Sequence, residues 1–215
     1  MAQKAFIFDL DGVIINSEPE WEKQKPAIYK KVFGESIASK LGSTLGINVD
    51  DIYEMAKKLG TSVDKQKLRG ALLQAALAIY DKAPITADLD KLVDVLVTKH
   101  YDIAIVSASP QEWIDQVMKR LRFKQLIRLS VSIYAKNDIK SKPAPDGYLY
   151  AIEQLGATPQ TTIILEDSNP GIASAKASGA FTIAFKESLV DGYKQIPGDI
   201  SANNIKDVIK IVQTR

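Results

Sequence analysis

The stretch FIFDLDGVI, residues 6–14, sets two carboxylates directly behind a short apolar run. The β-prone apolar residues at 5–8 predict a buried strand. Asp9 and Asp11 follow this strand at once, and Gly12 comes next. In a parallel sheet this acidic pair would lie at the carboxyl edge, where open α/β sheets bind their ligands. The stretch therefore predicts both a fold class and the place of a site.

Four further short runs rich in Ile, Val or Phe also predict buried strands, at residues 103–106, 130–134, 162–165 and 181–184. Helical spacing of apolar residues occurs between the later runs, at residues 89–97, 113–121 and 148–155. Gly156 and Gly179 stand where helices are expected to end. Strand and helix thus alternate, which predicts an α/β fold with a Rossmann-like three-layer core built on a parallel sheet.

One long stretch, residues 16–82, lacks a convincing strand and carries helical patterns such as 52–59 and 68–80. We expect it to form an α-helical insertion in a core made of residues 1–15 and 83–215. Pro26 interrupts the first helical pattern, which predicts a kink or a late helix start there. The loop at residues 42–46 is expected either to contact substrate or to serve only as a turn.

The bulk composition is that of an ordinary globular protein, with 46% apolar and 25% charged residues among 215. The absence of cysteine excludes disulfides, thiolate metal ligands and a cysteine nucleophile, and it fits a reducing compartment. No signal-peptide pattern or bilayer-length apolar run is visible, so we expect a cytoplasmic protein without a membrane partner. The net charge of +2 is spread along the chain, which argues against nucleic acid. We expect a monomer or a weak homodimer.

Further polar groups follow the later strands. Ser107-Ala108 ends the second run and offers a hydroxyl and backbone N–H groups to an anion. Lys142 lies in the proline-stiffened loop at residues 140–145, and Glu166-Asp167 ends the fourth run. We expect carboxylates, hydroxyl and amine to meet at one edge of the sheet.

Other conspicuous residues carry ordinary structural interpretations. Ser109 precedes Pro110 and a helical pattern, so we expect it to act mainly as a helix N-cap. His100, the only histidine, is expected at the surface or in packing. Trp21 and Trp113 fall on helical patterns and are expected to pack, although Trp21 could reach a cleft if its helix faces one.

The ordered set Asp9-x-Asp11-Gly12-Val13, Ser107, Lys142 and Glu166-Asp167 resembles the four motifs of the haloacid dehalogenase superfamily. It is most similar to the subgroup whose helical cap follows the first motif, which includes β-phosphoglucomutase and the small sugar-phosphate and phosphoglycolate phosphatases. The likeness covers nearly the whole chain.

This resemblance implies a magnesium-dependent phosphatase that acts on a small phosphorylated metabolite. Asp9 would attack phosphorus and become a phosphoaspartate, and Asp11 would serve as general acid and then general base. Magnesium would be held by the Asp9 carboxylate, the Asp11 backbone carbonyl, the Asp167 carboxylate and, through water, Glu166. The phosphate oxygens would be held by Ser107, Lys142 and the backbone of Ala108.

Two alternatives remain open. A phosphosugar mutase shares the motifs and the cap position, but Trp21 stands where the mutase cap carries a histidine, and residues 41–44 lack basic side chains. A silent binding or regulatory protein is disfavoured by the intact Asp9, Asp11, Lys142 and Asp167. Dehalogenases lack an acid at the position of Asp11. The substrate stays open among sugar phosphates, polyol phosphates and phosphoglycolate, and we expect the cap to close over it.

Overall fold

A computed structural model describes residues 3–42, 44, 47, 49–134 and 138–215. Internal contacts divide the chain into two compact units. The first unit combines Met1–Asn16 with Pro84–Arg215, and the second is the intervening Ser17–Ala83. The chain therefore leaves the first unit once and returns to it once.

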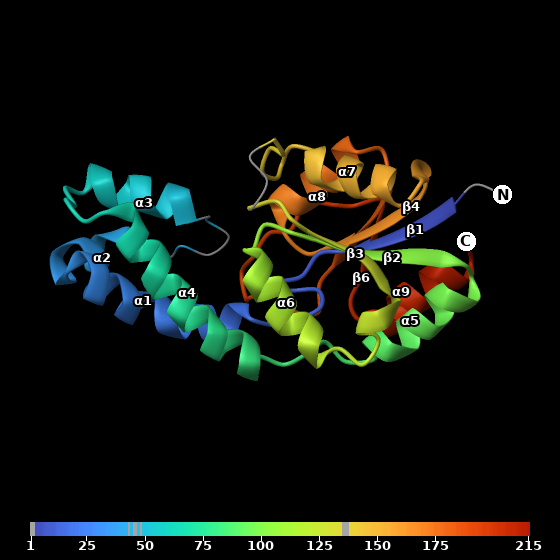
Figure 1. Cartoon of the computed structure of the whole chain (residues 1–215), viewed down its shortest axis with the longest axis horizontal. Helices are drawn as coiled ribbons and strands as arrows, with labels where there is room; N and C mark the ends of the chain where they lie inside the picture. Colours follow the sequence, from blue (N-terminus) through green and yellow to red (C-terminus); the bar gives the residue numbers. More distant parts are fainter. Residues whose placement is uncertain (1–2, 43, 45–46, 48, 135–137) are drawn as a thin grey trace. The chain divides into compact units, whose positions relative to one another are not determined.

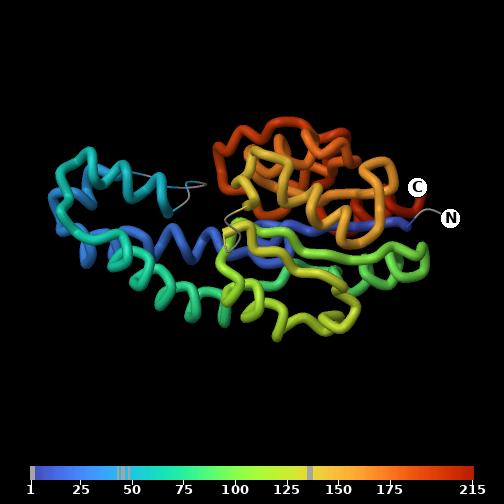
Figure 2. Tube along the Cα trace, turned by 45° about the horizontal axis from the view of Figure 1, so that its top comes forward, coloured from blue at the N-terminus to red at the C-terminus, as the bar shows by residue number. Residues whose placement is uncertain are grey.

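A six-stranded sheet in the order β3-β2-β1-β4-β5-β6 forms the centre of the first unit. All neighbouring strands pair in parallel. In Figure 2 the blue trace of β1 lies in the middle of this unit, between the green trace of β2 and the orange trace of β4. The strands are β1 (Gln3–Phe8), β2 (Tyr101–Ser107), β3 (Ile127–Ser132), β4 (Ala157–Glu166), β5 (Phe181–Phe185) and β6 (Ile200–Ala202).

Helices cover both faces of the sheet (Figure 1). One face carries α7 (Asp146–Gln154) and α8 (Asn169–Ala177), and the other carries α5 (Leu89–Thr98), α6 (Gln111–Arg120) and α9 (Ile205–Gln213). A short 3-10 helix, η1 (Lys124–Leu126), precedes β3. Among the described residues, no helix has the length and apolarity needed to span a membrane. The predicted three-layer α/β core with a parallel sheet is confirmed.

The strand order reverses beside β1. β2 and β3 lie on one side of β1, and β4, β5 and β6 lie on the other. The last paired residue of β1, Phe8, stands opposite Ile105 of β2 and Leu165 of β4. Helices on opposite faces diverge at such a reversal and leave a crevice beyond the strand ends, which is where ligands bind in open α/β sheets. The residues that follow β1 and β4 therefore occupy the topological switch point.

The sequence patterns located five strands but missed the sixth. β6 has only three residues, and two of them, Ile200 and Ser201, are exposed, so no apolar run marks it. β3 ends at Ser132, so the predicted extension to Tyr134 is wrong. β4 begins at Ala157, ahead of its apolar run, because its first half alternates between half-buried and exposed residues.

The second unit contains helices only, within the described residues between 17 and 83. These are α1 (Glu18–Phe33), α2 (Glu35–Leu41), α3 (Val49–Lys58) and α4 (Lys65–Lys82). The expected late start at Pro26 is wrong, because α1 begins at Glu18, has a proline in its first turn and continues through Pro26. Gly34, at φ 83°, separates α1 from α2.

The helical unit has its own apolar interior. Trp21 of α1 meets Tyr80 of α4 edge to face, with ring centroids 6.3 Å apart, and both rings are buried. The hydroxyls of Tyr29 and Thr44 lie 2.8 Å apart and share a hydrogen bond. Of the expected loop at residues 42–46, residues 43, 45 and 46 lie outside the described part of the chain.

The first unit closes the two ends of this insertion. The backbone N–H of Asn16 donates to the Pro84 carbonyl at 2.9 Å, and that of Thr86 donates to the Ile14 carbonyl at 2.9 Å. Ile15 and Ile85 form an antiparallel bridge between these bonds. The points where the chain leaves and re-enters the core are therefore paired with each other.

Candidate active site

Three carboxylates meet at the switch point between β1 and β4. The backbone N–H of Asp9 still donates to the Leu165 carbonyl at 3.0 Å, so Asp9 continues the strand pairing and its position is fixed by the sheet. Glu166 ends β4, and Asp167 follows it. Within the described residues, one carboxylate oxygen from each of Asp9, Glu166 and Asp167 lies within 4.8 Å of the others. The strand ends thus concentrate negative charge at one spot.

Lys142 lies between two of these carboxylates. Its Nζ donates to Asp9 Oδ1 at 2.5 Å and to Glu166 Oε1 at 2.5 Å. The three side chains are 7%, 10% and 0% exposed, so the contacts are shielded from water. Burial tends to lower the pKa of the Lys142 ammonium, but the charges of Asp9 and Glu166 outweigh it and hold the pKa well above its usual range. The lysine is therefore a permanent cation here.

One lysine does not balance the carboxylates around it. Burial, with the charges of Glu166 and Asp11, raises the pKa of Asp9 to about 8, although Lys142 opposes the shift. Burial and the charges of Glu166 and Asp9 also raise the pKa of Asp167 well above its usual range. Burial is the largest cause of both shifts and the neighbouring carboxylates add to it, so a bound divalent cation would favour the charged form of both groups. An all-oxygen donor set of this kind suits Mg²⁺, Mn²⁺ or Ca²⁺.

Glu166 is held by protein donors on both of its oxygens. Oε1 accepts from Lys142 and from the Tyr148 hydroxyl at 2.8 Å, while Oε2 accepts from the Ser168 N–H and hydroxyl, each at 3.1 Å. A Cβ at Gly171 would come within 1.8 Å of Glu166 Oε1, so only glycine fits at this position of α8. Glu166 therefore orients Lys142 directly.

Asp167 packs against the turn that follows Asp9. Gly12 has φ +78°, and a Cβ there would lie 1.9 Å from Asp167 Oδ2. Glycine is thus required twice at this position, once for the backbone conformation and once for the close approach of the carboxylate. This contact fixes one side of Asp167 and brings it to the acidic pair of the first motif.

The other polar groups come from the end of β2. Ser107 is 1% exposed, and its Oγ accepts from the Ser109 N–H at 3.0 Å. The expectation that Ser109 caps α6 is wrong, because Pro110 occupies the N-cap position and no side chain caps the helix. The Ser109 hydroxyl instead donates to Asp11 Oδ2 at 2.8 Å, a charged and therefore stronger acceptor. Ala108, between them, is exposed at the strand end.

Two contributors were missed by sequence reasoning. In the sequence Tyr148 is only an apolar position of a predicted helix, yet its hydroxyl contacts Glu166 and its ring lies beneath Lys142, with Nζ 5.0 Å from the ring centroid. A phenol on an otherwise buried helix face was the available signal. Gln195, in the loop before β6, donates to the Asp167 carbonyl at 2.7 Å, and nothing in the sequence marks it.

The remaining conspicuous residues behave as structural residues. His100 is exposed and ends the turn after α5 with φ 61°. Trp21 and Trp113 are buried on α1 and α6.

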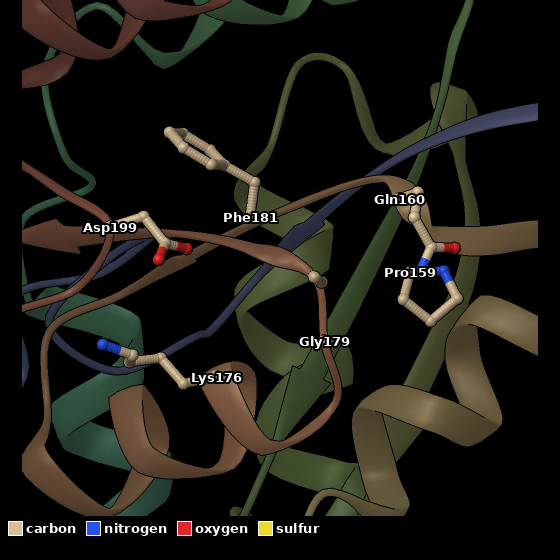
Figure 3. A pocket seen from close by; sticks show the side chains of 7 residues that line it. Pro159, Gln160, Lys176, Gly179, Phe181 and Asp199 are labelled. Atoms are coloured by element: carbon tan, nitrogen blue, oxygen red, sulfur yellow. The ribbon is translucent and has the colours of Figure 1, made fainter.

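A hollow of about 410 Å³ lies elsewhere on the first unit, at the amino end of β5 (Figure 3). It is lined by Pro159, Gln160, Lys176, Gly179, Ala180, Phe181 and Asp199. None of these residues belongs to the cluster at the carboxyl edge. The hollow and the cluster of buried charged side chains therefore lie in different places. We assign the site to the cluster, because buried groups with mutually shifted pKa values are typical of active sites.

The sequence is similar to known proteins over most of its length. A family model described as haloacid dehalogenase-like hydrolase matches residues 6–185. Hexitol phosphatase B of Escherichia coli K12 is 26% identical over 179 residues, which cover 81% of this chain and 79% of that protein. Validoxylamine A 7'-phosphate phosphatase of Streptomyces hygroscopicus subsp. limoneus is 29% identical over 188 residues, which cover 84% of each chain.

The fold is also shared with solved structures. A variant of CbbY from Rhodobacter sphaeroides, solved in complex with xylulose-(1,5)bisphosphate, superposes with a TM-score of 0.75 over 94% of each chain at 13% identity. At this identity the match bears on the fold alone.

Proposed function

The chain belongs to the haloacid dehalogenase-like hydrolases, and on that premise we propose that it hydrolyses the phosphate monoester of a small phosphorylated carbohydrate or polyol. The observation that carries the proposal is the buried contact of Asp9 with Lys142, 2.5 Å apart, beside Glu166 and Asp167. A carboxylate held this way at a strand end is fixed in position and faces a cation that can also bind phosphate.

In the proposed reaction the Asp9 carboxylate attacks phosphorus, the ester bond breaks, and a phosphoaspartate forms. Asp11 gives a proton to the leaving oxygen and then takes one from the water that cleaves the intermediate. The hydroxyl of Ser109, 2.8 Å from Asp11 Oδ2, supports this role because it holds the Asp11 carboxylate in one orientation. The products are inorganic phosphate and the free alcohol.

We assign the binding of the transferred phosphoryl group to Ser107, the backbone of Ala108, and Lys142. Its raised pKa keeps the Lys142 ammonium charged, so it can donate hydrogen bonds to phosphate oxygens without first gaining a proton. Glu166 and Tyr148 keep that ammonium near Asp9.

A magnesium ion fits the residues present. The candidate ligands are the Asp9 carboxylate, the Asp11 backbone carbonyl and the Asp167 carboxylate, with Glu166 acting through a bound water. When bound, the ion would neutralise charge on the transferring phosphoryl group. The clustering of the Asp9, Glu166 and Asp167 carboxylates supports this proposal, and the raised pKa values of Asp9 and Asp167 agree with it, because burial and neighbouring carboxylates disfavour their charged forms until a cation binds.

We propose the helical unit, residues 17–83, as a cap that selects the substrate, and the first unit as the part that carries the chemistry. The two relatives described above are phosphatases named for a hexitol and for validoxylamine A 7'-phosphate. Hexitol and sugar phosphates are therefore the first substrates to assay, followed by glycerol phosphates and phosphoglycolate.

The test is release of inorganic phosphate from this panel, and from p-nitrophenyl phosphate, with Mg²⁺ and with a chelator. We expect release that needs the metal and is lost in Asp9→Asn. A wild-type protein inert toward the whole panel in Mg²⁺ would refute the proposal. Conversion of β-glucose 1-phosphate into glucose 6-phosphate, with a trace of bisphosphate and without net phosphate release, would identify a mutase instead.

A further inference from the structure

We propose that Gln195 and Tyr193, in the loop between β5 and β6, are positioning residues that hold the Asp167 turn in its metal-binding geometry. The inference rests on the proposed function, because it assumes that Asp167 is a metal ligand. It concerns a segment, residues 193–196, that lies almost thirty positions after Asp167 in the chain.

Gln195 ties the turn to the sheet. Its Nε2 donates to the Asp167 carbonyl at 2.7 Å and to the Phe185 carbonyl at 2.7 Å. Phe185 is the fully buried last residue of β5, so one amide group joins the turn after β4 to the end of the neighbouring strand. Both hydrogens of the amide are used, and the Asp167 peptide cannot rotate without breaking one of these bonds.

The residues around Gln195 hold the next part of the same turn. The Tyr193 hydroxyl accepts from the Asn169 N–H at 2.8 Å. The Asn169 side chain in turn accepts from the Ile196 N–H at 2.7 Å and donates to the Lys194 carbonyl at 3.0 Å. Five hydrogen bonds in all therefore connect the segment 193–196 with the Asp167 turn and the end of β5.

The burial of Gln195 suggests a specific role for its amide. Its Oε1 is buried and has no hydrogen-bond partner among the described residues. A buried acceptor without a partner lowers the net stability that the two donated hydrogen bonds provide. The donor end is what the site uses.

The consequence for Asp167 follows from its two neighbours. Gly12 lies against the carboxylate, with room for no side chain, and Gln195 holds the carbonyl of the same residue. Asp167 is thus fixed at both its side chain and its backbone. Groups that orient a metal ligand typically change metal affinity about 10- to 100-fold when they are removed.

The experiment measures metal binding directly. The full-length wild type, Gln195→Leu, Tyr193→Phe and the matched control Lys194→Ala are titrated with Mn²⁺ and followed by the electron paramagnetic resonance signal of the free ion. Leucine keeps the approximate volume of Gln195 and removes both donated bonds. Phenylalanine at position 193 removes only the hydroxyl that accepts from the Asn169 N–H and leaves Gln195 in place. This variant therefore still tests the inference if the leucine variant does not fold. Lys194 takes part through its backbone, and its exposed side chain can be removed.

We expect about 10-fold weaker Mn²⁺ binding for Gln195→Leu and about threefold weaker binding for Tyr193→Phe, with Lys194→Ala within twofold of wild type. Phosphatase activity of Gln195→Leu should recover toward wild type at saturating Mg²⁺, which a general loss of structure would not allow. Wild-type affinity in folded Gln195→Leu or Tyr193→Phe protein, even with a lower melting temperature, would overturn the inference and leave the proposed function standing. No Mn²⁺ binding by the wild type would overturn the metal site itself.

Discussion

Two clusters of three charged side chains have opposite compositions and opposite surroundings. At the carboxyl edge of the sheet, one cation, Lys142, lies between Asp9 and Glu166, and all three side chains are at most 10% exposed. In the helical unit, one carboxylate, Asp50, lies between Lys65 at 2.8 Å and Arg69 at 2.9 Å, and these side chains are 32% to 51% exposed.

The electrostatic result differs in sign. Burial raises the pKa of Asp9 despite its contact with Lys142. Around Asp50, burial is the largest single cause and raises the pKa, but the hydrogen bonds and charges of Lys65 and Arg69 together outweigh it and lower the pKa below its usual value. Water screens the charges of the exposed cluster, whereas the buried cluster holds more carboxylates than cations out of water, and this excess of negative charge favours a bound cation.

The largest expected effect is on catalysis. Asp9→Asn keeps the shape of the nucleophile and removes its charge, so we expect phosphatase activity to fall on the order of 10⁴-fold or more. The measurement is phosphate release under saturating Mg²⁺. Asp50→Asn is the matched change in the exposed cluster, and its phosphatase activity should stay within about twofold of wild type, since surface substitutions usually have small effects. Equal losses of activity in both variants would show that Asp9 has no special catalytic role.

Lys142→Met should be the most destabilising change at the buried cluster. It leaves Asp9 and Glu166 without their shared cation, and the loss of one partner of a buried pair costs about 3–5 kcal/mol. Urea unfolding at pH 7 measures the free energy of unfolding. Lys65→Met is the control, with an expected loss below about 1 kcal/mol. A buried variant no less stable than the control would show that Lys142 does not compensate charge.

Added metal should stabilise the wild type by relieving the excess charge. At about 100 times the dissociation constant, Mg²⁺ should increase the free energy of unfolding by about 2.7 kcal/mol. Thermal melts with Mg²⁺ and with a chelator give the comparison. Asp167→Asn should respond much less, and a full response in that variant would place the ion elsewhere.

Tyr148→Phe tests the hydrogen bond from the Tyr148 hydroxyl to Glu166, the carboxylate that contacts Lys142. It removes the hydroxyl that donates to Glu166 and keeps the ring, so we expect a loss of about 2 kcal/mol, as for a hydrogen bond to a charged group. Activity should also fall, because Glu166 orients Lys142. The free energy of unfolding and the rate at saturating substrate report the two effects separately, and an unchanged rate would limit Tyr148 to stability.

The smallest effect is the pH dependence of the Asp50 cluster. Because its folded pKa lies below its unfolded pKa, Asp50 adds stability above about pH 4, and this is lost as the pH falls through the folded value. We expect wild type to exceed Asp50→Asn by less than about 1 kcal/mol at pH 7 and by nothing near pH 2, with screening by salt. Urea unfolding at both pH values, in low and high salt, checks this. A difference that grows toward low pH would reverse the assigned sign.

The sequence predicts elements that are marked by a regular apolar pattern, but it does not predict contacts that depend on one polar side chain. Residues 5–8 and 162–165 were recognised as strands because buried parallel strands are continuous apolar runs. The groups after them were then assigned to one edge by topology alone. Ser109 was misassigned because a serine before Pro110 has the pattern of a cap, and only the fold brings Asp11 within reach. Gln195 was missed because its partner is a backbone carbonyl, which has no sequence signature.

The paired ends of the insertion have a consequence for how such a protein can change. Asn16 and Pro84, with Ile15 and Ile85, form a closed junction that belongs wholly to the first unit. The hydrogen bonds of this junction involve no residue between 17 and 83. Lengthening, shortening or exchanging that excursion leaves the pairing of β1 with β2 and β4 undisturbed. With the role proposed above for the helical unit, substrate selectivity can change through this one segment while the residues at the carboxyl edge of the sheet stay as they are.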